Sequence, residues 1–134
     1  MYNDLSMVRL KALIDWSSIN AGDIYCIAEL YRQGDMSGAA EEMYLWALRG
    51  KEKAWGAEHT STLDTVNNLG LFYAEQGKMV EAEEMYLVAL RGYEKACGTE
   101  HLSVVRVVNN LCLLFIEQIR KQAFQPEEIV RDKF

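Results

Sequence analysis

The residues best suited to acid–base or metal chemistry are two histidines and two pairs of adjacent glutamates. His59 and His101 stand 42 residues apart, and Glu41-Glu42 recurs as Glu83-Glu84 at the same interval. Two histidines could share a metal ion, and paired carboxylates could act as acid and base, if the fold brought them face to face. Adjacent residues of a helix do not face each other. What these side chains can do therefore depends on the elements that hold them.

The same interval extends over a much longer stretch of the chain. Residues 41–54 differ from residues 83–96 at only two positions, Trp46/Val88 and Lys51/Tyr93. Such a period is typical of stacked arrays whose units cannot bury their apolar faces alone. Equivalent histidines then lie one unit apart, beyond the reach of one metal ion, and are expected to pack or cap in the linkers. We therefore predict no metal site, no cofactor and no catalytic residue.

Composition narrows the function classes further. The chain has 134 residues, half of them apolar, a net charge of −6 and three cysteines without a CxxC pair. An acidic chain without a basic run disfavours nucleic acid and anionic membranes as partners. An odd number of thiols favours a reducing, cytoplasmic setting. We expect no membrane span, because no apolar run approaches the ~20 residues that one needs, and no phosphate loop or nucleophile motif occurs. We expect a soluble protein that is not an enzyme.

Apolar residues recur at helical spacing, which predicts pairs of helices. The first pair is expected over residues 18–33 and 37–55, with a turn at Gly34, and the second over residues 61–76 and 79–98, with a turn at Gly77. Ser61 followed by Asp64 resembles a capping box at the start of the third helix. The turn of the first pair is shifted by one residue, and the register recovers by Ala40.

Both ends of the chain contain incomplete units. Met1-Tyr2 aligns with Met43-Tyr44 and Met85-Tyr86. Residues 1–14 are therefore interpreted as the later part of the second helix of an incomplete unit. The first helix of a third unit is expected from residue 102 to about 124, because Ile119 replaces the glycine that would end it in a turn. A short helix over residues 126–133 is expected to follow. The predicted units are residues 1–14, 15–55, 56–97 and 98–134 of one domain, with polar residues of the terminal segments capping the stack.

Small and aromatic residues repeat in phase and are predicted to form the core. Ala40/Ala82 and Gly70 would let helices approach closely, while tyrosines and one phenylalanine fill the remaining space. These aromatic residues are Tyr44/Tyr86 and Tyr31/Tyr73/Phe115. Gly50 and Gly92 lie inside predicted helices, where glycine is unfavourable. Their repetition indicates either close contact or a bend, and shared ancestry of the units explains it equally well.

The repeated motif resembles the tetratricopeptide repeat. The resemblance rests on Leu69-Gly70 with Tyr73 in one helix and on Ala82, Tyr86 and Ala89 in its partner. The 42-residue spacing and the Gly-x-Glu-His linkers resemble the longer kinesin-light-chain type, and repeat tracts of fungal nucleotide-binding receptor-like ATPases. The likeness covers about residues 14–118, with Cys112 departing from the small position held by Gly70. It implies an all-α, right-handed superhelical solenoid with two full repeats and partial terminal repeats.

In that family the first helix of each pair lines a concave groove that binds a protein or peptide. The resemblance places twelve residues of this chain in the groove: Tyr25, Glu29, Arg32, Asp64, Asn67, Leu71, Glu75, Arg106, Asn109, Leu113, Ile116 and Glu117. Asn67 and Asn109 would stand in a row. Their amides could hold an extended peptide backbone or could bond the neighbouring helix and order the stack.

The mixed charge of the groove favours a neutral or mildly basic segment over a terminal carboxylate or an acidic peptide. The leading prediction is therefore a peptide-binding scaffold. Two alternatives stay open. The chain could self-assemble through apolar helix faces at the ends of the stack, or it could be a piece of a larger receptor-like ATPase.

Overall fold

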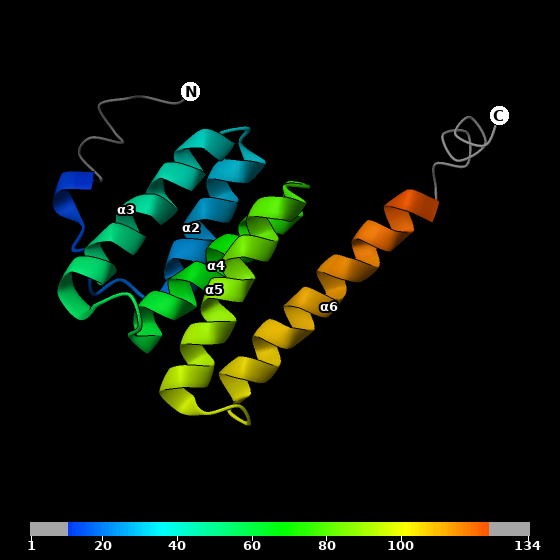
Figure 1. Cartoon of the computed structure of the whole chain (residues 1–134). Helices are drawn as coiled ribbons and strands as arrows, with labels where there is room; N and C mark the ends of the chain where they lie inside the picture. Colours follow the sequence, from blue (N-terminus) through cyan, green and yellow to red (C-terminus); the bar gives the residue numbers. More distant parts are fainter. Residues whose placement is uncertain (1–10, 124–134) are drawn as a thin grey trace.

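The computed structural model describes residues 11–123, and these fold into antiparallel helices without a strand. The helices are α2 (Ala21–Gln33), α3 (Ser37–Trp55), α4 (Thr60–Glu75), α5 (Met79–Cys97) and α6 (Leu102–Ala123). Neighbouring helices stack side by side, with α6 at one end (Figure 1). The prediction of an all-α helical repeat is confirmed, while the handedness of the superhelix stays a prediction. The predicted helix over residues 126–133 and most of the first segment lie outside the described residues.

The histidines begin two of the helices. His59 Nδ1 accepts the Ser61 backbone N–H at 3.1 Å, and His101 Nδ1 accepts the Ser103 N–H at the same distance. Each imidazole thus satisfies a backbone donor that the first turn of a helix leaves free. The expectation that the histidines cap the linkers is confirmed. The predicted Ser61–Asp64 capping box is wrong, because His59 occupies the capping position and Asp64 bonds elsewhere.

The first pair differs from the second at its start and at its turn. Helix α2 begins at Ala21, three residues later than predicted, because the Asn20 side chain accepts the Gly22 N–H at 2.6 Å and caps the helix there. At the turn, Gly34 has a φ of −88° and the left-handed conformation falls on Asp35, with a φ of 61°. In the second pair Gly77 itself takes a φ of 80°. The one-residue shift seen in the sequence is therefore a real change of turn.

Close contacts explain the glycines inside helices. A Cβ on Gly92 would lie 2.5 Å from a methyl of buried Leu63, and one on Gly70 would lie 2.8 Å from the Tyr86 ring. A Cβ on Gly50 would meet Trp16 at 3.0 Å. Of the explanations open from the sequence, close contact is therefore the one the structure supports. The small residues let α4 and α5 pack closely around large side chains, each worth ~2 to 3 kcal/mol when buried.

The core follows the length of the stack up to α6, where it changes. Tyr44, Tyr86, Ala40 and Ala82 are fully or almost fully buried, as predicted. Phe115, also predicted to lie in the core, is 42% exposed, because no helix among the described residues covers that side of α6. Helix α6 is also long and apolar enough to cross a membrane by length and composition alone. The earlier expectation that no segment reaches that length is thus wrong.

Candidate functional site

The first helices of the three units, α2, α4 and α6, enclose two gaps. We call the space between α2 and α4 the first gap and the space between α4 and α6 the second gap. Helix α6 diverges from α4 toward its carboxyl end, so the second gap widens upward in the view of Figure 1. Residues at equivalent positions of the 42-residue repeat line both gaps. Their differences decide which gap is open.

A polar cluster closes the first gap. The Tyr25 hydroxyl on α2 donates to Glu75 Oε1 on α4 at 2.5 Å. Arg32 Nε lies 2.6 Å from Glu29 Oε2 on its own helix and 3.8 Å from Glu75 Oε2 across the gap. Buried beneath this cluster is Tyr44, whose hydroxyl has no hydrogen-bond partner among the described residues. The sequence placed four of these residues in the groove, and the structure brings them together.

Each titratable group of the cluster responds to its neighbours. The Arg32 guanidinium holds the pKa of Glu29 below its ordinary value through their hydrogen bonds. Loss of solvent raises the pKa of Glu75, and the neighbouring Glu29 adds to this effect against the opposing Tyr25 bond. Burial, followed by the bond to Glu75, raises the pKa of Tyr25 far above its usual range. The cluster therefore holds an arginine, a phenol and two glutamates, and the pKa of each glutamate depends on its neighbours in the cluster.

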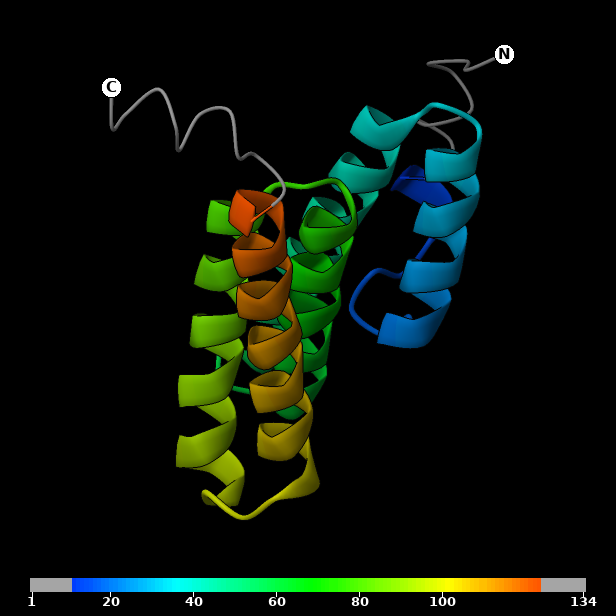
Figure 2. The same cartoon turned by 90° about the vertical axis from the view of Figure 1, so that its right-hand side faces the viewer.

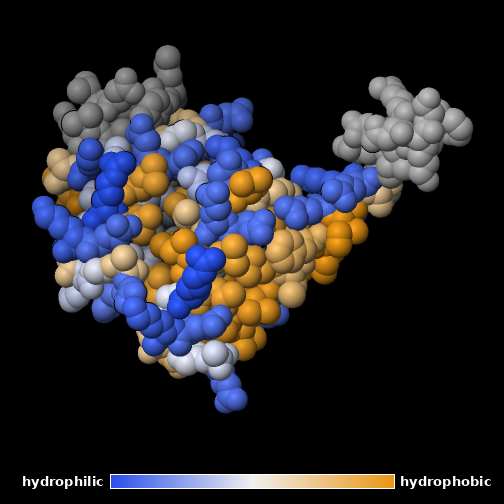
Figure 3. All heavy atoms as spheres, viewed as in Figure 1, coloured by the Kyte–Doolittle hydropathy of each residue, from blue (hydrophilic) through white to orange (hydrophobic). Residues whose placement is uncertain are grey.

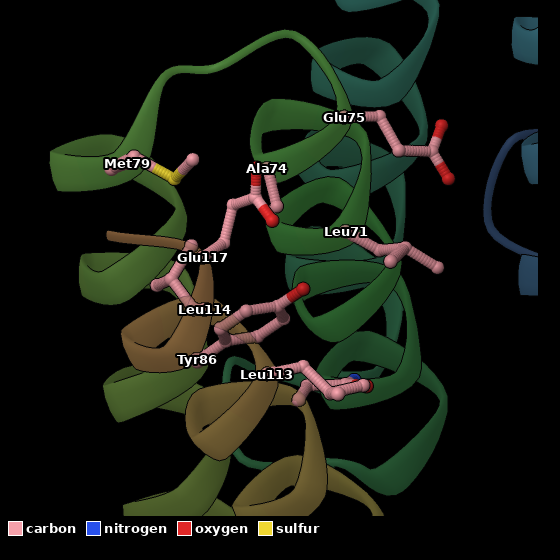
Figure 4. Close-up of a pocket in the computed structure, with 9 residues that line it drawn as sticks. Leu71, Ala74, Glu75, Met79, Tyr86, Leu113, Leu114 and Glu117 are labelled. Atoms are coloured by element: carbon pink, nitrogen blue, oxygen red, sulfur yellow. The ribbon is translucent and has the colours of Figure 1, made fainter. Parts of the chain in front are cut away.

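The second gap holds a hollow of about 180 Å³. Figure 4 shows Leu71 and Glu75 of α4 on one side and Leu113 and Glu117 of α6 on the other. The lining is mainly apolar, with two carboxylates and one amide: Leu71, Ala74, Glu75, Met79, Tyr86, Asn110, Leu113, Leu114 and Glu117. A mostly apolar hollow with a few polar groups is the usual form of a ligand site.

Three substitutions between repeats account for the open second gap. Tyr25, which spans the first gap, is replaced at the equivalent position of α4 by the shorter Asn67. Glu29 and Arg32 are replaced by Leu71 and Ala74. Neither replacement can form an ion pair across the gap, so Glu117 on α6 pairs with Arg120 on its own helix instead. The apolar side chains of α4 and α6 are left facing a hollow.

The asparagines bond from helix to helix. Asn110 Nδ2 on α6 donates to Asn67 Oδ1 on α4 at 3.1 Å, and the equivalent Asn68 donates to the Ala21 carbonyl at the start of α2, also at 3.1 Å. Asn67 is only 3% exposed, whereas Asn109 is exposed. The predicted row of Asn67 and Asn109 is therefore not present as a pair of accessible amides. The structure places Asn67 in the bond that orders the stack.

The other predicted groove residues lie apart from the hollow. Asp64 accepts a hydrogen bond from the Tyr93 hydroxyl of α5, while Arg106 and Ile116 are exposed on α6. Sequence reasoning did not assign Tyr86, Met79, Asn110 and Leu114 to the site. The sequence did contain a signal for Asn110, because Asn-Asn-Leu recurs in phase and the second asparagine of each pair is as strongly repeated as the first. Tyr86 was assigned only to the core, although it also forms part of the lining.

Comparison with protein families agrees with the repeat found in the sequence and structure. Residues 62–103, which hold most of α4, all of α5 and the linker to α6, match the family model of the tetratricopeptide repeat. The chain contains a tetratricopeptide-type repeat. Its matched residues equal one 42-residue unit of the internal repeat. No curated protein matches the chain. The kinesin-light-chain type and the receptor-like ATPase context stay predictions.

The tetratricopeptide assignment agrees with the chemistry of the surface. Repeats of this family generally form interaction scaffolds for proteins, and the family is generally not enzymatic. Within residues 11–123 no group of three histidine, cysteine or acidic side chains is placed to hold a metal ion. The side chains that the repeat brings together are suited to contact another chain.

Proposed function

We propose that the second gap binds an extended protein segment, with one apolar side chain of that segment in the hollow. The observation that carries this proposal is the contrast between the gaps at equivalent positions. The same scaffold is sealed by Tyr25 and Glu75 in the first gap and left with an apolar hollow in the second. A hollow of about 180 Å³ has room for one large aliphatic or aromatic side chain.

The charges at the hollow select the flanks of that segment. Glu75 and Glu117 bring acidic groups to the edge of the hollow from α4 and α6, with the Glu75 carboxylate turned toward Tyr25 and Arg32 (Figure 4) and Glu117 beside Arg120. A bound segment with lysine or arginine on both sides of its apolar residue would place opposite charges next to these carboxylates. An acidic segment would bring like charges together, which costs affinity. The proposed partner is therefore a neutral or basic segment of another protein, met in the cytoplasm.

The probes for this proposal are acetylated peptides of the form Lys-Gly-Leu-Gly-Lys, labelled with a fluorophore. Two further peptides replace the lysines by glutamate or the leucine by glycine. We expect the lysine–leucine peptide to bind most tightly in fluorescence anisotropy titrations, and Leu113→Glu to weaken it about tenfold or more, because the change puts a third carboxylate into the apolar lining.

A matched control is Val88→Glu on α5, since Val88 is also an exposed apolar residue but does not line the hollow. It should bind the peptide as the parent chain does. Equal binding of all three peptides, or equal weakening by both substitutions, would refute the proposed site.

A further inference from the structure

We propose that a second face of α6 is a self-association surface, on which two copies of the chain pack α6 against α6. This face, called the outer strip, is formed by Val105, Val108, Cys112, Phe115 and Ile119. All five residues are exposed to solvent, and the exposed fractions of the four residues other than Cys112 range from 41% to 65%. None of them lines the hollow of the second gap. The inference therefore stands apart from the proposed peptide site.

The internal repeat shows what the outer strip is built to contact. Its equivalents on α4, 42 residues earlier, are Leu63, Val66, Gly70 and Tyr73, and helix α5 packs directly on Leu63 and Gly70. Leu63, Val66 and Tyr73 are only 1%, 5% and 8% exposed. On α6 the same positions have no helix over them among residues 11–123, and α6 lies in front of its neighbours in Figure 2. Within residues 11–123, the outer strip is thus a helix-binding face on which no helix packs.

A second apolar strip of α6 is already buried against the rest of the stack. Val104, Val107, Leu111 and Leu114 are 0% to 7% exposed and pack on the rest of the stack. Together the two strips explain why α6 is so apolar along its length. Apolar residues gather along α6 in the space-filling view (Figure 3). An exposed apolar band of this kind marks an interaction surface.

The spacing within the outer strip favours a second helix that runs along α6. Its residues follow one another at intervals of three, four, three and four. This is the heptad spacing at which two helices pack side chain between side chain. The strip extends over 14 residue steps, or ~21 Å of helix. A second copy of α6 offers a helix with the same spacing and the same length.

The described residues do not supply this helix. Residues 124–134 number 11, so even as one straight helix they would reach ~16 Å, less than the ~21 Å of the strip. The first described residue lies at the opposite end of the stack, where Lys11 Nζ is 5.2 Å from the Trp46 ring centroid on α3. A second copy of α6, by contrast, offers a helix of the full length.

Cys112 decides which helix of a second copy fits. Gly70 allows the Tyr86 ring of α5 so close that a Cβ would lie at 2.8 Å. Cys112 has that Cβ and a sulfur atom, so a helix with tyrosine at this position cannot approach in the same way. The amino-terminal segment of a second copy aligns with α5 and has Tyr2 at the Tyr86 position. End-to-end continuation of the solenoid is therefore disfavoured, and α6 against α6 is favoured.

A two-fold arrangement also suits the composition of the strip. None of the five residues carries a charge at neutral pH, so two strips can meet without bringing like charges into contact. Cys112 is the middle residue of the strip, with two members on each side. In a symmetric pair of α6 helices, each Cys112 therefore lies at or near the two-fold axis, beside its copy.

The first test measures mass by light scattering after size exclusion, from micromolar to millimolar chain. We expect a monomer–dimer equilibrium, and Val108→Glu should raise its dissociation constant about tenfold or more, because it buries a carboxylate in the pair. Val88→Glu, an exposed apolar position on α5, should leave the dimer unchanged. Circular dichroism of both variants should match the parent chain, since neither side chain is buried.

The second test crosslinks Cys112 with copper phenanthroline, which accepts the two electrons released as two thiols form one disulfide. We expect a covalent dimer in the parent chain and in a Cys26→Ser/Cys97→Ser variant, and none in Cys112→Ser. A constant monomer mass would overturn the proposal, as would a dimer that Val108→Glu leaves intact. A mass that climbs beyond the dimer would show end-to-end stacking instead. Binding of the chain to phosphatidylcholine–phosphatidylglycerol vesicles through the outer strip would show that a lipid surface is its partner.

Discussion

The two gaps between the first helices of the repeats share one scaffold and differ in their chemistry. In the first gap Tyr25 reaches across to Glu75, and Arg32 holds Glu29 beside them. In the second gap the equivalent residues are Asn67, Leu71 and Ala74, and a hollow of about 180 Å³ remains. Helix packing is the same in kind because the small and aromatic core residues repeat. A few substitutions on the inner face are enough to turn a sealed contact into a binding site.

The largest expected effect distinguishes structural from accessible asparagines. Asn67→Ala removes the acceptor of the Asn110 amide at a position that is 3% exposed. Losing the buried Asn67 side chain together with its bond to the half-buried Asn110 amide should cost about 1 to 3 kcal/mol of the free energy of unfolding. Asn109→Ala, on the exposed side of α6, should change it by no more than about 0.5 kcal/mol. Urea unfolding followed by circular dichroism measures both, and equal effects would contradict the assigned roles.

A smaller effect is expected from opening the first gap. Tyr25→Phe removes the hydroxyl that donates to Glu75, and the loss should be about 1 kcal/mol of the free energy of unfolding. A double-mutant cycle with Glu75→Gln isolates the contact, since the two changes should then be less than additive. Strictly additive changes would mean that the hydrogen bond does not hold the gap closed.

The smallest expected effect is a difference in pKa between Glu75 and Glu117, which stand at equivalent positions of the repeat. Loss of solvent raises the pKa of Glu75 above 4.5, whereas the bond to Arg120 lowers the pKa of Glu117 below 4.5. On acidification Glu75 should therefore bind its proton first. The stabilising contribution of Glu117 is present above pH 4.5 and is lost as pH falls through its folded pKa, while the contribution of protonated Glu75 is present below pH 4.5 and is lost as pH rises through its raised folded pKa.

Carboxyl-carbon shifts in nuclear magnetic resonance follow both titrations separately. Arg120→Gln is the control, because it should return the pKa of Glu117 toward its ordinary value without moving that of Glu75. The reverse order of protonation would show that the two gaps do not differ as described.

The sequence was sufficient for the helices and their order because apolar periodicity and an in-phase repeat fix which faces must pack. Residues 37–55, for example, form α3 as predicted. The sequence was less informative where one side chain has several possible bonding partners. Nothing in the spacing decides whether Asn67 contacts a ligand or Asn110. The closed first gap depends on how far Tyr25 and Arg32 reach in three dimensions. Phe115 was placed in the core by analogy with Tyr73, although its covering helix is not present among the described residues.

The most direct test exchanges the chemistry of the gaps. Leu71→Glu with Ala74→Arg places in the second gap the glutamate and arginine that stand at these positions in the first, and Glu29→Leu with Arg32→Ala is the matched reverse exchange. Calorimetric titration with the Lys-Gly-Leu-Gly-Lys peptide should show at least about a tenfold loss of affinity in the first variant, about 1.4 kcal/mol, and no loss in the second. Equal affinity of both variants, with helix content unchanged, would contradict the claim that the second gap is the binding site.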